Sequence, residues 1–323
     1  MPSQSSEDDY LDSYSSSEQH LPNPTSSSSL SSISPLSSRS LSAISNLARY
    51  RPPPPLTRDT AEFEQDGHYG RAAVLVCLFG NRSGENLNVL LTTRAKSLRT
   101  FPGQVALPGG KMDPTDMNLE ATARREAFEE VGLPIDTTRI RYLCTLPPLL
   151  MRNLTLVTPV VVLILDYSLK PELSKEEVED VFSFPLEGFL LSYPRPPIFP
   201  RPVPSDAPPY HSFEDYKWYD DKDYRFHSFE LGTHKRPRGE AITGVTAEIL
   251  IQIARIAYER EPEFEMKAKG QMDGRELGEV ARRDRRWKES RKEQREREEG
   301  REKERKRLEQ DEKREKKLLP GKL

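Results

Sequence analysis

The amino-acid sequence predicts one α/β domain between two tails that lack a core of their own. Three observations carry this prediction. Strand-like apolar runs and helical apolar patterns alternate between about residues 70 and 260. Residues 1–65 are rich in serine and proline, and residues 263–323 are mostly charged, so we expect a disordered tail and a charged helical or disordered tail there. Hydrophobic residues are only 35% of the 323, which is too few for two full cores.

The central part alternates strands with helices. Apolar runs predict a hairpin from residues 72–79 and 88–94 around a Gly-containing turn. A loop rich in Gly and Pro then leads to a helix over residues 119–131, with Asp116 as its N-cap and Gly132 just after its end. Further elements are expected in order: strands at 140–146 and 156–165, a proline-rich insertion at 194–209, a strand at 224–231 and a helix at 245–258.

Charge and cysteine content exclude several classes of protein. The net charge of -3 gives no overall attraction to nucleic acid, so we do not expect nucleic-acid binding. The two cysteines, Cys77 and Cys144, lie in apolar runs, which excludes a disulfide framework and favours buried thiols. No apolar run approaches the roughly 18 residues of a membrane-spanning helix, so no membrane span is expected.

Three carboxylates on the first predicted helix are the strongest chemical signal. Glu126, Glu129 and Glu130 are spaced i, i+3 and i+4, so they share one helix face. They repel one another unless a cation neutralises them, and their hard oxygen ligands suit Mg²⁺ or Mn²⁺. An acidic surface face would give the same pattern. The arginine before the first carboxylate and the glycines on both sides favour a metal site.

These residues resemble the signature of the Nudix hydrolase family. Residues 125–133 read REAFEEVGL and match the second half of that signature completely, and Gly110 fits its opening glycine. Asp116 stands in place of the isolated glutamate, with eight rather than seven residues between it and Arg125. The resemblance covers about residues 68–260 and implies a domain at 66–262 with an α/β/α sandwich around a mixed sheet.

A second motif resembles the signature of the coenzyme A diphosphatase subfamily. Residues 90–95 read LLTTRA and are followed at regular spacing by Arg99, Gly103 and the segment LPGG at 107–110, where the subfamily usually has Phe at position 107. Arg94 and Arg99 offer planar forks for phosphate oxygens, although surface charge or an internal ion pair would explain them too. The resemblance assigns Arg94, Arg99 and Gly103 to substrate binding.

The resemblance implies a metal-dependent reaction. Glu126, Glu129 and Glu130 are then metal ligands, with the carbonyl of Gly110 completing the shell, and Arg125 orients a carboxylate by a salt bridge. The expected reaction hydrolyses the pyrophosphate of coenzyme A or acyl-CoA to 3′,5′-ADP and 4′-phosphopantetheine or its acylated form. A carboxylate of the signature, or one outside it, takes the proton of the water, with Glu129 or Glu130 as good a candidate as any other. Two alternatives stay open: a Nudix hydrolase of another substrate such as ADP-ribose or a dinucleotide, and a non-catalytic scaffold.

The two ends of the chain predict little about function. The terminal Gly321-Lys322-Leu323 differs from the peroxisomal Ser-Lys-Leu address at one position, so we expect a peroxisomal protein, with cytoplasmic and mitochondrial locations as alternatives. The acidic first residues do not favour a mitochondrial presequence. The charged C-terminal tail predicts a solvated segment, and the sequence names no partner for it.

Overall fold

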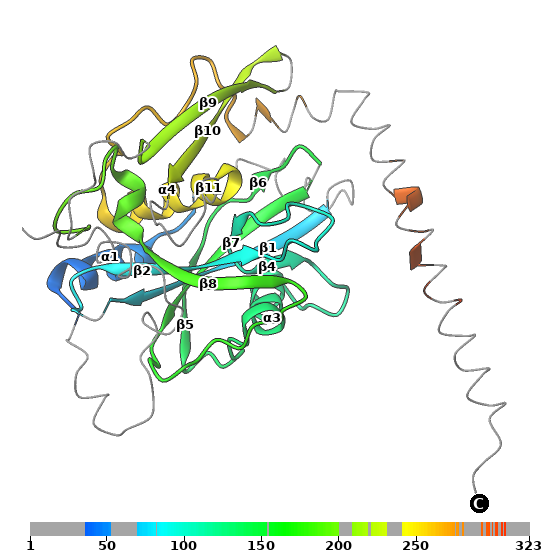
Figure 1. Cartoon of the computed structure of the whole chain (residues 1–323), viewed down its shortest axis with the longest axis horizontal. Coiled ribbons are helices and arrows are strands. Elements are labelled where there is room, and N and C mark those ends of the chain that lie inside the picture. Colours follow the sequence, from blue (N-terminus) through cyan, green and yellow to red (C-terminus); the bar gives the residue numbers. More distant parts are fainter. Residues whose placement is uncertain are drawn as a thin grey trace, which may run out of the picture.

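The computed structural model describes residues 36–52, 70–81, 83–153, 155–199, 209–218, 221–230 and 241–274, with scattered positions from 276 to 307. A mixed sheet lies between helices on both of its faces (Figure 1), which is the expected α/β/α sandwich. The strands of this sheet are β1 (Gly70–Gly80), β2 (Leu87–Arg94), β3 (Val105–Ala106), β4 (Gly109–Lys111), β5 (Ile140–Thr145), β6 (Leu149–Leu150), β7 (Thr155–Ile164) and β8 (Val178–Pro185).

The strands pair in the order β3-β2-β1-β7-β5, with β4 on β1, β6 on β7 and β8 on β2. Strands β1 and β2 are antiparallel, with Leu78 opposite Val89, which confirms the predicted hairpin. Strand β7 runs parallel to β1, so the sheet is mixed. Because β4 pairs with the first half of β1, the Gly-rich segment lies on the sheet directly before the chain enters the next helix.

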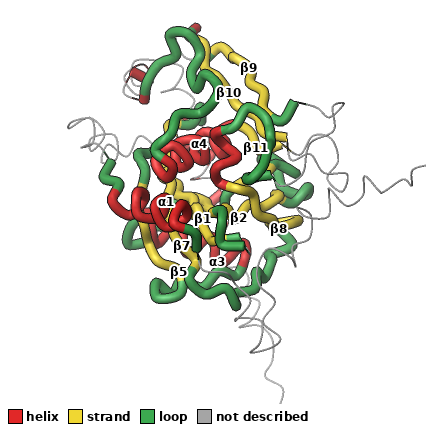
Figure 2. The backbone as a smooth tube through the Cα atoms, turned by 90° about the vertical axis from the view of Figure 1, so that its left-hand side faces the viewer, coloured by secondary structure: helices red, strands yellow, loops and turns green. Residues whose placement is uncertain are grey.

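Alternation along β1 places side chains in two cores. Val76 and Leu78 belong to the core under α1 (Ser38–Arg49) and α4 (Gly244–Tyr258). Leu75 and Cys77 point to the other face, which α3 (Leu119–Val131) covers. Figure 2 shows α1 and α4 on one side of the sheet and α3 on the other. The period of two in the strand therefore sets the three layers.

A second, three-stranded antiparallel sheet packs beside α4 (Figure 1). It consists of β9 (His211–Lys217), β10 (Asp223–Glu230) and β11 (Ala241–Thr243), and β10 confirms the strand predicted at 224–231. The short 3-10 helix η3 (Leu186–Leu190) joins β8 to this region. Phe229 of β10 is fully buried and meets the ring of Phe189 from η3 at a centroid distance of 5.1 Å.

Helix α3 spans the predicted residues 119–131, but its N-cap was predicted wrongly. The cap is Asn118, whose side chain accepts a hydrogen bond from the backbone N–H of Ala121 at 2.8 Å. Asp116 instead binds Arg125, because the longer loop carries its carboxylate back over the helix. Gly132 ends the helix in the left-handed conformation, as predicted.

Helix α1 lies within the segment that the sequence predicts to be disordered, and the structure corrects that prediction for residues 38–49. Ala43 and Leu47 are spaced four apart, so they share one helix face and are buried in the core against α4. Ser37 caps the helix by accepting a hydrogen bond from the N–H of Ser40 at 3.1 Å. Because serine dominates the composition of this segment, its few apolar residues did not predict a helix. Residues 1–35 and 53–65 lie outside the described residues.

The core also continues past residue 262, where the sequence predicts that the charged tail begins. Phe264 and Met266 pack against the larger core, and Ala268 is buried. Leu277 is buried against Leu156 of β7. The boundary predicted at 263 is therefore too early, because a few apolar residues are interspersed among the first charges of the tail. Residues 200–208 of the proline-rich insertion lie outside the described residues.

Two further predictions concern thiols and membranes. Cys77 and Cys144 are both buried and unbridged, as predicted. Burial raises the pKa of each thiol to about 12, so both are protonated and inert at neutral pH. No helix in the described part of the chain is long and apolar enough to cross a membrane.

Candidate active site

Two glycines of β4 allow the chain to pass closely between β1 and α3. A Cβ atom on Gly109 would lie 2.3 Å from the carbonyl oxygen of Ala73, and the φ angle of Gly109 is +155°. A Cβ atom on Gly110 would lie 2.5 Å from the carboxylate of Glu126. Only glycine fits at position 109, where the closest atoms belong to the backbone, whereas a side chain at position 110 would displace the carboxylate of Glu126. The carboxylate of Glu126 therefore lies directly against the backbone of Gly110.

Glu130 occupies the most enclosed position among the carboxylates of α3. Glu130 is only 5% exposed, and its Oε2 accepts a hydrogen bond from the backbone N–H of Gly109 at 3.1 Å. Burial, together with the charges of Glu126 and Glu177, raises the pKa of Glu130 to about 7, although the hydrogen bond and Arg94 act in the opposite direction. Burial also raises the pKa of Glu126. The charged forms of these two carboxylates are therefore disfavoured where they lie, and a bound cation would stabilise them.

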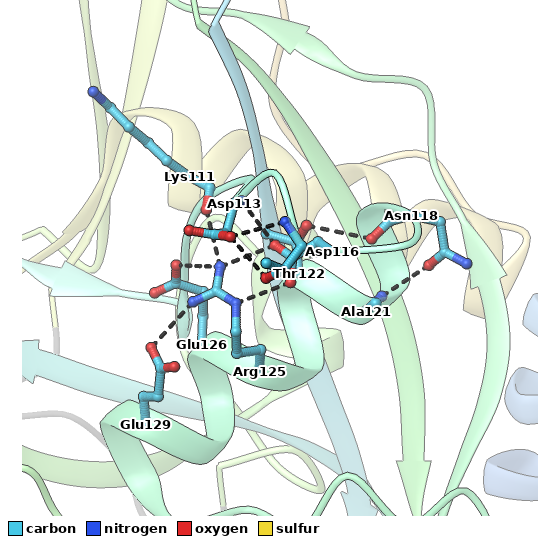
Figure 3. A network of polar contacts seen from close by, with 10 residues as sticks. Lys111, Asp113, Asp116, Asn118, Ala121, Thr122, Arg125, Glu126 and Glu129 are labelled. Atoms are coloured by element: carbon cyan, nitrogen blue, oxygen red, sulfur yellow. Dashed lines mark hydrogen bonds and ion pairs between the residues drawn. The ribbon is translucent and has the colours of Figure 1, made fainter. Parts of the chain in front are cut away.

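Arg125 organises the carboxylates around the first turns of α3 (Figure 3). Its Nε and Nη2 donate to the two oxygens of Asp116 at 2.9 and 3.0 Å. Its Nη2 also lies 3.0 Å from Glu126 Oε1 and donates to the carbonyl of Lys111 at 3.1 Å. The bidentate bond from Arg125 to Asp116 lowers the pKa of Asp116 to about 2. One guanidinium therefore fixes the loop before α3, the end of β4 and the helix itself.

Glu129 lies at the outer side of this group. Its side chain is 53% exposed, and its Oε2 accepts a hydrogen bond from Arg125 Nη1 at 3.1 Å. In Figure 3 this carboxylate reaches toward Arg125 from the next turn of the helix. The helix thus presents a buried pair, Glu126 and Glu130, and one exposed carboxylate beside it.

The donor set fits a hard divalent cation, although the carboxylates are not closed into a ready cage. Among the described residues, no group of three or more His, Cys, Asp or Glu side chains is arranged to hold a metal ion. Glu126 and Glu130, however, are crowded and desolvated carboxylates beside the backbone of Gly110. Two such carboxylates with a carbonyl oxygen are the ligands that Mg²⁺ and Mn²⁺ prefer. Glu129 is bound to Arg125 in this arrangement.

The predicted substrate residues lie on the connection from β2 to β3. Arg94 ends β2, and its Nε is buried without a hydrogen-bond partner within the described structure. Its charge acts on Glu130, so the guanidinium lies near the carboxylate pair. Gly103 lies beside Arg94 at the base of the loop, because its N–H donates to the carbonyl of Arg94 at 3.1 Å. Arg99 lies on the exposed part of the loop, and no described contact joins it to the carboxylates.

Sequence reasoning missed one acidic residue of this region. Glu177 lies in the turn before β8, and its charge raises the pKa of both Glu126 and Glu130. Its backbone carbonyl accepts a hydrogen bond from the N–H of Ala95 at 2.9 Å, which ties that turn to the end of β2. The sequence offers only a short acidic run there, without a motif. The pairing of β2 with β8 brings it to the site.

This chain is similar in sequence to a known family and to several known proteins. Residues 69–202 match the NUDIX domain family. The chain is 37% identical over 65% of its length to Nudix hydrolase 15, mitochondrial, and 36% identical over 60% to Nudix hydrolase 22, chloroplastic, both from Arabidopsis thaliana. These alignments span 65% and 57% of the two plant proteins. The chain is also 32% identical, over 60% of its length and 73% of the relative, to the peroxisomal coenzyme A diphosphatase NUDT7 of Mus musculus. The chain belongs to the Nudix family.

Proposed function

We propose that this protein hydrolyses the pyrophosphate bond of coenzyme A and its acylated derivatives, with Mg²⁺ or Mn²⁺ as cofactor. The products are 3′,5′-ADP and 4′-phosphopantetheine or its acylated form. The observation that carries the proposal is the position of Arg94. This residue belongs to the LLTTRA motif, its Nε is buried without a hydrogen-bond partner among the described residues, and its charge acts on Glu130. The name of the mouse relative supports the same substrate.

In this proposal Glu126, Glu129, Glu130 and the carbonyl of Gly110 would hold the metal, and Glu129 would have to exchange its bond to Arg125 for it. The metal supplies charge neutralisation for the pyrophosphate and an activated water. Arg94 binds a phosphate oxygen through its fixed fork of N–H donors. Glu129 and Glu130 remain equal candidates to take the proton of the water. Glu129 is exposed and bound to Arg125, whereas Glu130 is buried and accepts a hydrogen bond from the N–H of Gly109.

The proposal covers the organisation of the chain as well. We propose that the catalytic unit extends from about residue 66 through α4 and its following segment, with α1 added to its core. Peroxisomal residence stays a prediction, because the plant and mouse relatives carry the names of three different organelles. Residues 321–323, on which that prediction depends, lie outside the described residues.

Product analysis tests the function directly. The full chain is incubated with coenzyme A and Mg²⁺ or Mn²⁺, beside ADP-ribose and NADH, and the products are separated. We expect 3′,5′-ADP and 4′-phosphopantetheine, and a loss of about 100-fold or more in kcat for Glu129→Gln and Glu130→Gln. Glu120→Gln is the matched control on the same helix, because Glu120 pairs with Arg124 rather than with the carboxylate group.

Other outcomes would redirect the proposal. Turnover of ADP-ribose or NADH without coenzyme A would retain the metal site and reject the substrate. No turnover of any of the three would favour a scaffold. Full activity of both glutamine variants would reject the carboxylates of α3 as the catalytic group.

A further inference from the structure

The loop between β2 and β3 closes on Arg94 at its base and holds the aromatic ring of Phe101 out into solvent. Phe101 is 60% exposed, and within the described structure its ring contacts no other aromatic ring and no cation. A single exposed apolar side chain is ordinary by itself. The backbone at this position is not ordinary, and it provides the second observation.

Phe101 has a φ angle of +53°, which places it in the left-handed region. Bulky residues rarely adopt this conformation, because Cβ approaches the neighbouring carbonyl. Phe101 also precedes Pro102, and a residue before proline is restricted toward extended conformations. Strained residues of this kind persist only where the surrounding structure over-determines them, and they concentrate at ligand-binding sites.

The surrounding loop is closed tightly enough to hold this conformation. Pro102 and Gly103 occupy the centre of a turn in which the N–H of Gln104 donates to the carbonyl of Phe101 at 3.4 Å. Gly103 has a φ of +71°, as the third residue of a type II turn requires. Arg94 brackets the loop, since its N–H donates to Gln104 at 3.0 Å and its carbonyl accepts from Gly103 at 3.1 Å.

The base of the loop is joined to the carboxylate group. Ala95 donates its N–H to the carbonyl of Glu177, and Lys96 forms an ion pair of 2.9 Å with Glu179. Arg94 and Glu177 both act electrostatically on Glu130. The exposed ring is therefore carried on a short, braced loop whose base forms one wall of the site.

We propose that Phe101 is a specificity-determining residue that stacks on the base of the nucleotide half of the substrate. The inference rests on the proposed function for the identity of that substrate. An exposed ring on a backbone fixed by the closed loop offers a flat apolar face, and stacking of a base on such a face is a strong contact that leaves the reacting phosphates untouched. Arg94 at the loop base would meet a phosphate while the ring meets the base.

The test measures binding of the two product halves as well as turnover. In the full chain, Phe101→Ala is expected to raise KM for coenzyme A about tenfold with kcat unchanged, because base stacking stabilises ground state and transition state alike. Calorimetry of the same variant is expected to show that 3′,5′-ADP binds about tenfold more weakly, while the affinity for 4′-phosphopantetheine is unchanged. Phe101→Trp is expected to restore both values. Tyr193→Ala is the matched control, since Tyr193 is 58% exposed and packs on Arg195 instead.

A structural role for Phe101 predicts a different result. If the ring stabilised the loop, Phe101→Gly would lower the melting temperature. We expect no decrease, because glycine accepts a positive φ, while binding of 3′,5′-ADP falls as in the alanine variant. Unchanged 3′,5′-ADP binding, or selective loss of 4′-phosphopantetheine, would overturn the inference. Because product binding needs no turnover, an inactive chain that still loses 3′,5′-ADP on substitution would reject the proposed function and retain this inference.

Discussion

At the scale of single residues, Arg125 acts through its neighbours. It binds Asp116, Glu126 and Glu129 and the carbonyl of Lys111, so it fixes where the carboxylates of α3 and the loop before it lie. No contact in the described structure directs it at a separate substrate pocket. We therefore regard it as a positioning residue.

Arg125→Lys tests this role. A lysine is a single point charge and cannot form the bidentate bond to Asp116 while also reaching two glutamates. We expect Mn²⁺ affinity and kcat to fall about 10- to 100-fold, as for other residues that orient metal ligands, with little change in KM. Metal titration of the full chain measures the first quantity. Asp116→Asn should give a smaller change in the same direction, and wild-type Mn²⁺ affinity in both variants would contradict the assignment.

A pair of histidines away from the carboxylates is expected to contribute to the response of stability to pH. His211 Nε2 lies 3.0 Å from His227 Nδ1, and His211 stacks on Phe264 with ring centroids 3.7 Å apart. Burial, His227 and Arg225 together lower the pKa of His211 to about 4. An unfolded histidine has a pKa near 6.5, so between about pH 6.5 and 4 the unfolded chain binds the additional proton.

The contribution of His211 to the free energy of unfolding should therefore be complete above about pH 6.5 and decrease as the pH falls toward 4. We expect a loss of about 1 kcal/mol between pH 7 and 5 from this site, reduced from the full shift because the ring is partly exposed. His211→Gln keeps a donor at Nε2 and removes the titration, so its stability should vary less over this range. Urea denaturation at several pH values measures both. Equal slopes for the two proteins would exclude His211 as the source.

At the scale of elements, α1 is part of the folded domain and not an appendage. Arg39 forms an ion pair with the buried Glu187 of η3, and Asn46 donates a hydrogen bond to the carbonyl of Ala257 in α4 at 3.0 Å. Ser40 donates to the carbonyl of Gly84 in the β1–β2 turn at 3.1 Å. Side chains of α1 thus fix it to three different elements.

Leu47→Ala measures how much this packing stabilises the protein. Leu47 is fully buried, and removing three carbon atoms should lower the free energy of unfolding by about 3 kcal/mol. Ser45→Ala, on the exposed side of α1, is the control and should change stability little. Chemical denaturation gives both values. If Leu47→Ala were as stable as the wild type, α1 would not be docked in solution.

At the scale of the whole molecule, the question is where the folded unit ends. The segment after α4 is held at several points, including a hydrogen bond at 2.9 Å from the N–H of Arg225 to Gln271. Trp218 at the end of β9, Leu156 of β7 and Leu277 meet in a small apolar cluster. The C-terminal segment therefore connects the two sheets.

Two truncations separate the packed segment from the charged residues beyond it. A chain ending at residue 262 loses Phe264, Met266, Ala268 and Leu277, and its free energy of unfolding should fall by about 3 kcal/mol or more. A chain ending at residue 281 keeps these residues and should match the full chain. Thermal melts of both truncations decide between them, and equal melting temperatures would place the boundary back at 263.

Local features of this protein could be predicted from its amino-acid sequence. Helical spacing placed Glu126, Glu129 and Glu130 on one side of α3, Gly132 marked the end of that helix, and the apolar run at residues 72–79 marked β1, because each depends on contacts a few residues apart. The tertiary structure alone decided the contact of Asp116 with Arg125, the approach of Glu177 to the carboxylates and the docking of α1. Each of these depends on how strands and helices distant in the chain are brought together, and the packing of the whole core sets that arrangement.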